Sequence, residues 1–164
     1  MEIRSFHEPD SGTWTYLLAD PDTGATALID PVWVYDPVSG QTDRSFIDTV
    51  LETAQAAGWR IEWVLETHAH ADHLSAAELV RKATGARLAC GAGITAVQHN
   101  FARVFNLADL PTDGRQFDRL GKPPFVRATP LFDHQVWTVN VSPFSPFPFC
   151  PADRGSFRTL SREG

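Results

Sequence analysis

The sequence predicts an α/β fold in which strands and amphipathic helices alternate. Short apolar runs lie between segments of helical periodicity, and glycine, proline or aspartate ends most of them. The run Trp59–Glu66 is largely apolar, which is typical of a strand covered on both faces. The predicted order is β-β-β-α-β-α-β-α, without an internal repeat.

Three strands are expected in the first part of the chain. The segments Glu2–His7 and Thr13–Ala19 come first, and the second is rich in Thr, Trp and Tyr, which favour strands. Asp20–Gly24 has turn composition, because proline presets φ and glycine allows a positive φ. The strand Ala25–Ile29 follows. The next segment, Val32–Thr42, contains several chain breakers and is predicted to be a loop.

The first helix is predicted between Asp43, a candidate N-cap, and Gly58, a candidate end. Its apolar residues recur at helical spacing: Phe46, Ile47, Val50, Leu51 and Ala54.

The second helix is predicted to begin with a capping box formed by Ser75 and Glu78 and to end at Gly85. A strand at Arg87–Cys90, a helix over about 94–105 and a polar loop at 107–120 complete this part.

Composition and charge exclude several classes of function. The chain has 164 residues, of which 43% are hydrophobic and 21% charged, and this suits one globular domain. The net charge of −6 without a basic stripe argues against nucleic acid as the main partner. No apolar run is long enough to span a membrane, and the first residues do not have the pattern of a secretory signal. A cytoplasmic location is therefore expected.

The composition changes sharply near residue 121. Residues 1–121 contain 9 basic and 17 acidic residues, whereas residues 122–164 contain 5 and 3. The second part also holds 7 of the 12 prolines, and those within 142–149 exclude a regular helix or a central strand. We therefore predict a folded domain at 1–120 and a Pro/Phe-rich, poorly ordered tail at 121–164.

One cluster of residues has the side chains expected of a metal site. His68, His70, Asp72 and His73 directly follow the buried strand, at the position where open α/β sheets place their sites. In a turning segment these side chains can point into one cleft, with Asp72 and His73 at the start of the next helix. Imidazoles suit zinc and iron, and a carboxylate adds a hard ligand, so the cluster predicts a site for one or two divalent ions. Asp72 is also the candidate catalytic residue.

For the remaining candidates a structural role is the stronger interpretation. His7 falls in a surface strand and His99 on a helix face, and Cys90 is expected to be a small core residue. Asp30 is expected to hold the turn next to its strand rather than to bind metal. Cys150 has no visible redox partner, so the two cysteines do not form a disulfide framework.

The segment Thr67–His73 resembles the T-H-x-H-x-D-H signature of the metallo-β-lactamase superfamily. Because alanine occupies the position where glyoxalase II carries a third consecutive histidine, the motif is more similar to the persulfide dioxygenase branch and its bacterial β-lactamase-like hydrolase relatives. The Asp30-Pro31 and Glu66-Thr67 pairs and the segment 111–118 add to this resemblance, which covers roughly residues 1–120.

The resemblance implies an αββα sandwich, truncated here to its N-terminal half, with one face of the half-sandwich uncovered. In hydrolytic members the positions of His68 and His70 bind one metal ion, and those of Asp72 and His73 a second. In persulfide dioxygenases one ferrous ion is held by two histidines and an aspartate, and His68 is the one ligand that this motif would supply.

The implied substrates are small thiol derivatives. A persulfide dioxygenase converts glutathione persulfide and oxygen to glutathione and sulfite with Fe²⁺, whereas the hydrolytic alternative uses Zn²⁺-activated water on a glutathione thioester. A homo-oligomer is a further possibility. A structural zinc module is a weaker alternative, because the two cysteines lack the necessary spacing.

The second half of the chain departs from the family pattern. His134 and Asp133 lack the expected Gly-His and Gly-Asp contexts. We therefore keep a non-catalytic remnant as the alternative function, with 121–164 as a shifted-frame or otherwise unrelated tail on a truncated gene and a genuine alternative C-terminus as the second interpretation.

Overall fold

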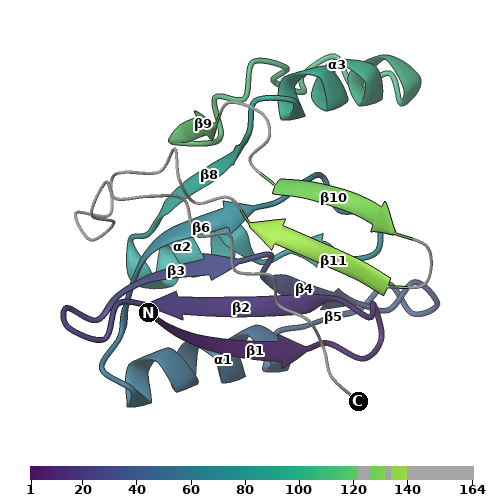
Figure 1. The fold of residues 1–164 in the computed structure, drawn as a ribbon. Helices are drawn as coiled ribbons and strands as arrows, with labels where there is room; N and C mark the ends of the chain where they lie inside the picture. Colours follow the sequence, from purple (N-terminus) through teal and green to yellow (C-terminus); the bar gives the residue numbers. More distant parts are fainter. Residues whose placement is uncertain (122–125, 132–133, 140–164) are drawn as a thin grey trace.

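A twisted six-stranded sheet forms the body of the protein (Figure 1). The computed structural model describes residues 1–121, 126–131 and 134–139. In the order β1-β2-β3-β6-β8-β9, the first three strands run antiparallel and the last four, from β3 on, run parallel. The strands are β1 (Glu2–His7), β2 (Trp14–Ala19), β3 (Ala25–Ile29), β6 (Arg60–Glu66), β8 (Arg87–Gly91) and β9 (Arg119–Gly121).

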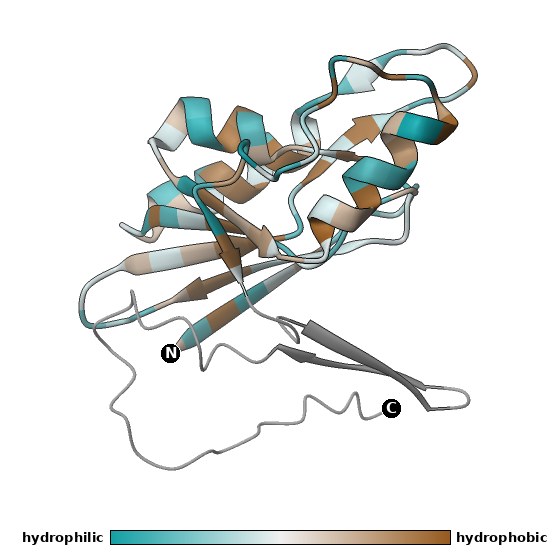
Figure 2. Cartoon of the chain, turned by 90° about the horizontal axis from the view of Figure 1, so that it is seen from above, coloured by the Kyte–Doolittle hydropathy of each residue, from teal (hydrophilic) through white to brown (hydrophobic). Residues whose placement is uncertain are grey.

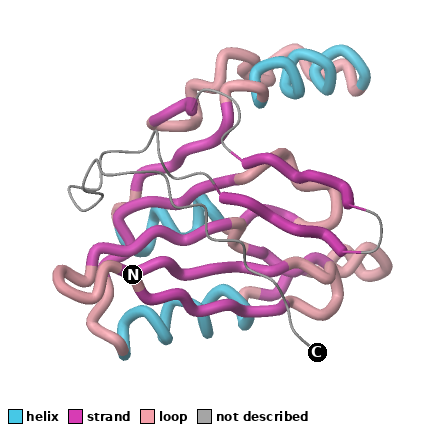
Figure 3. The backbone as a smooth tube through the Cα atoms, viewed as in Figure 1, coloured by secondary structure: helices cyan, strands magenta, loops and turns pink. Residues whose placement is uncertain are grey.

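Three helices connect these strands. The helices α1 (Ser45–Ala56) and α2 (Ala77–Thr84) lie on one face of the sheet, and α3 (Ile94–Val104) lies beyond the end of β8 (Figures 1 and 3). Gly58 and Gly85, the predicted helix ends, both adopt positive φ just after α1 and α2. Only glycine enters this conformation without a steric cost, which explains why the two helices end there.

The sheet has an apolar layer on each face. Between the sheet and the two helices, Leu28, Val64 and Leu88 of the strands pack in one cluster with Ile47, Val50 and Val80. Figure 2 shows the hydrophobic stretches of the central strands and of the helix faces turned toward them.

The opposite face carries a second cluster of five side chains, each at most 4% exposed: Ala27, Ile29, Trp63, Leu65 and Ala89. The expectation of an uncovered face is therefore wrong for these residues.

The predicted loop Val32–Thr42 begins with a strand. The segment Val32–Tyr35 forms β4, which pairs with β5 (Thr42–Asp43) and β7 (Leu74–Ser75) in a second, three-stranded sheet. Its β-branched and aromatic residues favour extended backbone, but the neighbouring Asp-Pro and Ser-Gly pairs led to the loop prediction. The loop prediction is wrong over these four residues.

The predicted capping box at α2 does not form. The helix begins at Ala77, and Ser75 belongs to β7, where its hydroxyl donates to Glu66 and accepts a hydrogen bond from the Ala77 N–H. Glu78 instead pairs with Arg81 one turn later. Ser75 thus still accepts a hydrogen bond at the start of α2, but its hydroxyl donates to Glu66, nine positions earlier, and Glu78 does not complete the box.

The predicted tail contains two described strands. β10 (Val126–Leu131) and β11 (His134–Val139) pair antiparallel with each other as a separate sheet. The Pro/Phe run at 142–149, Asp133 and Cys150 lie outside the described residues, so the boundary at 120 stays a prediction. Within the described part of the chain, no helix is long and apolar enough to cross a membrane.

Stability is expected to depend on the layer between sheet and helices. Leu28 is 0% exposed, and its replacement by alanine should lower the free energy of unfolding by about 2–5 kcal/mol, because burial is lost and a cavity remains. Urea denaturation of the two proteins measures this difference. Val38, which is 95% exposed, provides the control. If Leu28→Ala lowered the free energy of unfolding no more than Val38→Ala does, the packing between sheet and helices would be contradicted.

Candidate metal centre

The four clustered ligand-type residues lie in the loop that joins β6 to β7. This loop leaves the sheet at the carboxyl end of β6, beside the carboxyl end of β3, where Asp30 follows Ile29. Asp72 and His73 therefore precede a short strand and not a helix, which corrects one detail of the prediction. The position at the carboxyl edge of parallel strands agrees with the prediction.

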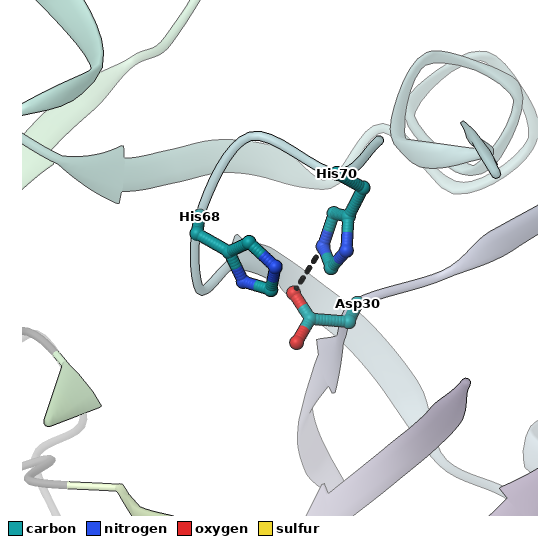
Figure 4. Close-up of side chains that lie close together, drawn as sticks. All are labelled: Asp30, His68 and His70. Atoms are coloured by element: carbon teal, nitrogen blue, oxygen red, sulfur yellow. Dashed lines mark hydrogen bonds and ion pairs between the residues drawn. The ribbon is translucent and has the colours of Figure 1, made fainter. Parts of the chain in front are cut away.

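The structure brings these residues together with Asp30. Two groups have ligand atoms within 4.8 Å of one another, namely Asp30, His68 and His70, and His70, Asp72 and His73. The His70 ring lies between the others, with its centroid 4.2 Å from that of His68 and 4.3 Å from that of His73. Figure 4 shows His68 and His70 converging on the Asp30 carboxylate.

Asp30 holds the loop in place. Its carboxylate accepts hydrogen bonds from the Thr67 N–H and hydroxyl at 2.8 and 2.7 Å and from His70 Nε2 at 3.0 Å. The backbone of Asp30 adopts φ 47°, a conformation that aspartate tolerates better than most residues. This geometry gives Asp30 the turn-holding role that the sequence favours, although its carboxylate also lies within one of the potential ligand groups.

His70 is held by two carboxylates. Besides Asp30, Glu66 places Oε2 at 3.2 Å from His70 Nε2. Burial lowers the pKa of His70, but the hydrogen bond to Asp30 and the negative charges of Asp30 and Glu66 outweigh it and raise the pKa to about 10. Both acids lie on the Nε2 side of the ring, so Nδ1 is the atom that faces Asp72, at 3.9 Å from Oδ1.

Thr13 orders the other end of the cluster. Its hydroxyl donates to Asp72 Oδ2 at 2.7 Å and lies 3.2 Å from His73 Nδ1. The half-exposed Asp72 carboxylate has a pKa of about 2, because bonds from Thr13 and His73 outweigh its partial burial. Burial and the neighbouring His70 charge lower the pKa of His73, which favours the neutral, ligand-competent imidazole.

His73 supplies the observation that tests whether a metal ion fits. Its side chain is 1% exposed, and its Nε2 atom is buried without a hydrogen-bond partner among the described residues. A buried polar atom of this kind is costly unless something satisfies it. With Nδ1 turned toward Thr13 and Asp72, Nε2 is free to bind a metal ion. The donor set of imidazoles and a carboxylate therefore fits a divalent cation.

A cavity of about 440 Å³ opens beside the cluster. Its lining includes His68, His70 and His73 and apolar side chains such as Phe117. Cys90 also lines it, but burial, followed by the charge of Glu66, raises the pKa of this thiol to about 12. Cys90 is thus a protonated wall residue, in agreement with its predicted role in the core.

The structure also shows which residues sequence analysis missed. Thr13 and Glu66 contact the cluster, and Ser75 contacts Glu66. Thr13 is 59 and 60 positions from its partners, so no local pattern indicates it, whereas Glu66 lies four positions before His70. His7 packs on Trp14 and His99 is exposed on α3, and neither belongs to the two potential ligand groups. The side chain of His134 lies outside the described structure.

Comparison with known proteins agrees with the motif. The model of the Metallo-beta-lactamase superfamily matches residues 9–143. A probable metallo-hydrolase of Burkholderia pseudomallei is 44% identical over 121 residues, which are 73% of this chain and 41% of that protein. A beta-lactamase hydrolase-like protein of Agrobacterium fabrum is 42% identical over 118 residues, which are 72% of this chain and 27% of that protein.

A third relative carries a more specific name. The mitochondrial persulfide dioxygenase ETHE1 of Bos taurus is 34% identical over 79 residues, which are 48% of this chain and 26% of that protein. The chain thus spans less than half the length of each of these three relatives. The family match covers most of the chain and includes the whole histidine-aspartate loop, so this chain belongs to the metallo-β-lactamase superfamily.

Proposed function

We propose that this chain carries the metal-binding loop of an enzyme that acts on a small thiol derivative, with His68, His70, Asp72 and His73 as metal ligands. The observation that carries the proposal is the group formed by His70, Asp72 and His73, whose ligand atoms lie within 4.8 Å of one another, together with the buried His73 Nε2 that has no hydrogen-bond partner among the described residues. These three donors lie close enough to share one ion, and a cavity adjoins the two histidines.

The residues of the chain have distinct tasks in this proposal. His70, Asp72 and His73 would hold the ion together, and His68, whose ring centroid lies 4.2 Å from that of His70, would supply a further imidazole ligand. Asp30 and Thr13 keep the two ends of the loop in position. A divalent ion bound there would supply Lewis-acid or redox chemistry to a substrate. Asp72, the catalytic candidate, is ionised at neutral pH and half exposed, so it can also accept a hydrogen bond from a bound substrate or water.

A glutathione persulfide is the favoured substrate. The likeness to a persulfide dioxygenase supports sulfur chemistry, for which we propose Fe²⁺ as the ion. The hydrolase-like relatives support hydrolysis as the second candidate, for which we propose Zn²⁺ and a glutathione thioester. Both substrates carry a sulfur atom that must approach the ion. Phe117 and Leu88 line the same cavity as the histidines and would contact an apolar part of such a substrate.

The competing hypothesis is a non-catalytic remnant that keeps part of the metal site. It is supported by the sequence contexts of His134 and Asp133, which lack the Gly-His and Gly-Asp patterns expected for the family. Sequencing the gene beyond codon 110 in all three frames would discriminate between the hypotheses. A resumed Gly-His and Gly-Asp pattern in another frame favours the remnant, whereas its absence makes His134 and Asp133 the next residues to mutate.

Removal of one proposed ligand should abolish tight metal binding. We expect His73→Ala to weaken Zn²⁺ binding by more than about 100-fold, because changes in the residues that only orient ligands already cost 10–100-fold. Competition with a chromophoric chelator measures the affinity. His99→Ala, which changes an exposed histidine on α3, is the matched control and should bind like the parent. Equal binding by His73→Ala would remove His73 from the site.

Turnover tests the activity itself. The parent chain loaded with Fe²⁺ should consume oxygen with glutathione persulfide, and His68→Ala should lower the rate by at least about 100-fold, because the cluster loses an imidazole ligand. Oxygen uptake and sulfite formation are the measurements. Equal background rates for the two proteins would favour the non-catalytic remnant.

A further inference from the structure

Glu66 is a buried acid that the proposed function does not yet use. It is the last residue of β6, immediately before the metal-binding loop, and its side chain is 7% exposed. It belongs to neither group of potential ligands. A buried carboxylate is costly unless hydrogen bonds or charges compensate it, so its two oxygen atoms need partners.

The first carboxylate oxygen of Glu66 links the two ends of the metal-binding loop. Glu66 Oε1 accepts a hydrogen bond from the Ser75 hydroxyl, nine positions later in β7. Ser75 in turn accepts a hydrogen bond from the Ala77 N–H at 3.0 Å, where α2 begins. This chain of contacts joins the end of β6 to the start of α2, on either side of the residues that carry the candidate ligands.

The second oxygen faces His70. Oε2 lies 3.2 Å from His70 Nε2, but Asp30 takes the aligned hydrogen bond from that nitrogen at 3.0 Å. Oε2 is buried and has no aligned donor among the described residues. A link to Ser75 alone would not require this second oxygen to face the ring. The two carboxylates therefore both face Nε2, and Nδ1 is the ring nitrogen directed toward Asp72.

We propose that Glu66 is a positioning residue of the metal centre: it ties the loop through Ser75 and orients His70 so that Nδ1 is presented to the ion. The inference rests on the proposed metal site. Outer carboxylates on ligand histidines fix the tautomer, orient the ring and increase its basicity. Asp30 performs this task from β3, and Glu66 adds a second negative charge from β6.

The substitution Glu66→Gln removes the negative charge of the side chain and keeps its size and shape. The amide oxygen can still accept the Ser75 hydroxyl, while the negative charge beside His70 is lost. In the full chain, chelator competition should show Zn²⁺ affinity reduced by about 10–100-fold, with the melting temperature of the metal-free protein unchanged. Glu62→Gln, which changes a more exposed acid of the same strand paired with Arg60, is the matched control and should bind like the parent.

A second measurement does not depend on how well the variant folds. In the zinc-loaded parent, ¹⁵N spectra of the histidine rings should show His70 bound through Nδ1 and protonated at Nε2. Binding through Nε2 would overturn the proposal, as would unchanged affinity of folded Glu66→Gln. If the parent itself binds no zinc, the proposed function fails as well. Tight binding by both the parent and Glu66→Gln would overturn the role of Glu66 alone.

Discussion

The hydrogen bonds between Asp30 and the loop after β6 are the constraint on which the site depends. They join the carboxyl ends of two parallel neighbours, β3 and β6, and fix Thr67 and His70 relative to the sheet. The helices α1 and α2 pack on one face of the sheet, and the five apolar side chains of the second cluster are buried on the other. The loop thus takes its geometry from a packed scaffold, which is the requirement for a preorganised metal site.

Two sets of contacts hold the loop. We call the one around His70 the inner side and the one around Asp72 and His73 the outer side. On the inner side, Asp30 and Glu66 hold the Nε2 edge of His70 and raise its pKa to about 10, so a metal ion must displace a proton from the ring. On the outer side, Thr13 holds Asp72 and lies beside Nδ1 of His73, leaving the buried Nε2 of that residue unpartnered. His70 from the inner side and Asp72 and His73 from the outer side form the group that would bind the ion.

Local patterns in the sequence predicted much of this structure but not the contacts between distant residues. Helix ends at Gly58 and Gly85 follow from their positive φ, and the site position follows from a motif placed after a buried strand. The link from Ser75 to Glu66 replaced a predicted capping box, and Val32–Tyr35 became a strand because β7 and β5 both pair with it. Such pairings depend on the fold and have no local signature.

The central claim is that the loop after β6 gathers one cation between His70, Asp72 and His73. Anomalous X-ray scattering at the zinc edge, from crystals of the full chain grown with Zn²⁺, tests it most directly. The account predicts a peak bounded by His70 Nδ1, an Asp72 oxygen and His73 Nε2, with ligand distances of about 2.0–2.2 Å. A peak elsewhere, or a hydrogen-bonded His73 Nε2 with no peak beside it, would contradict the account.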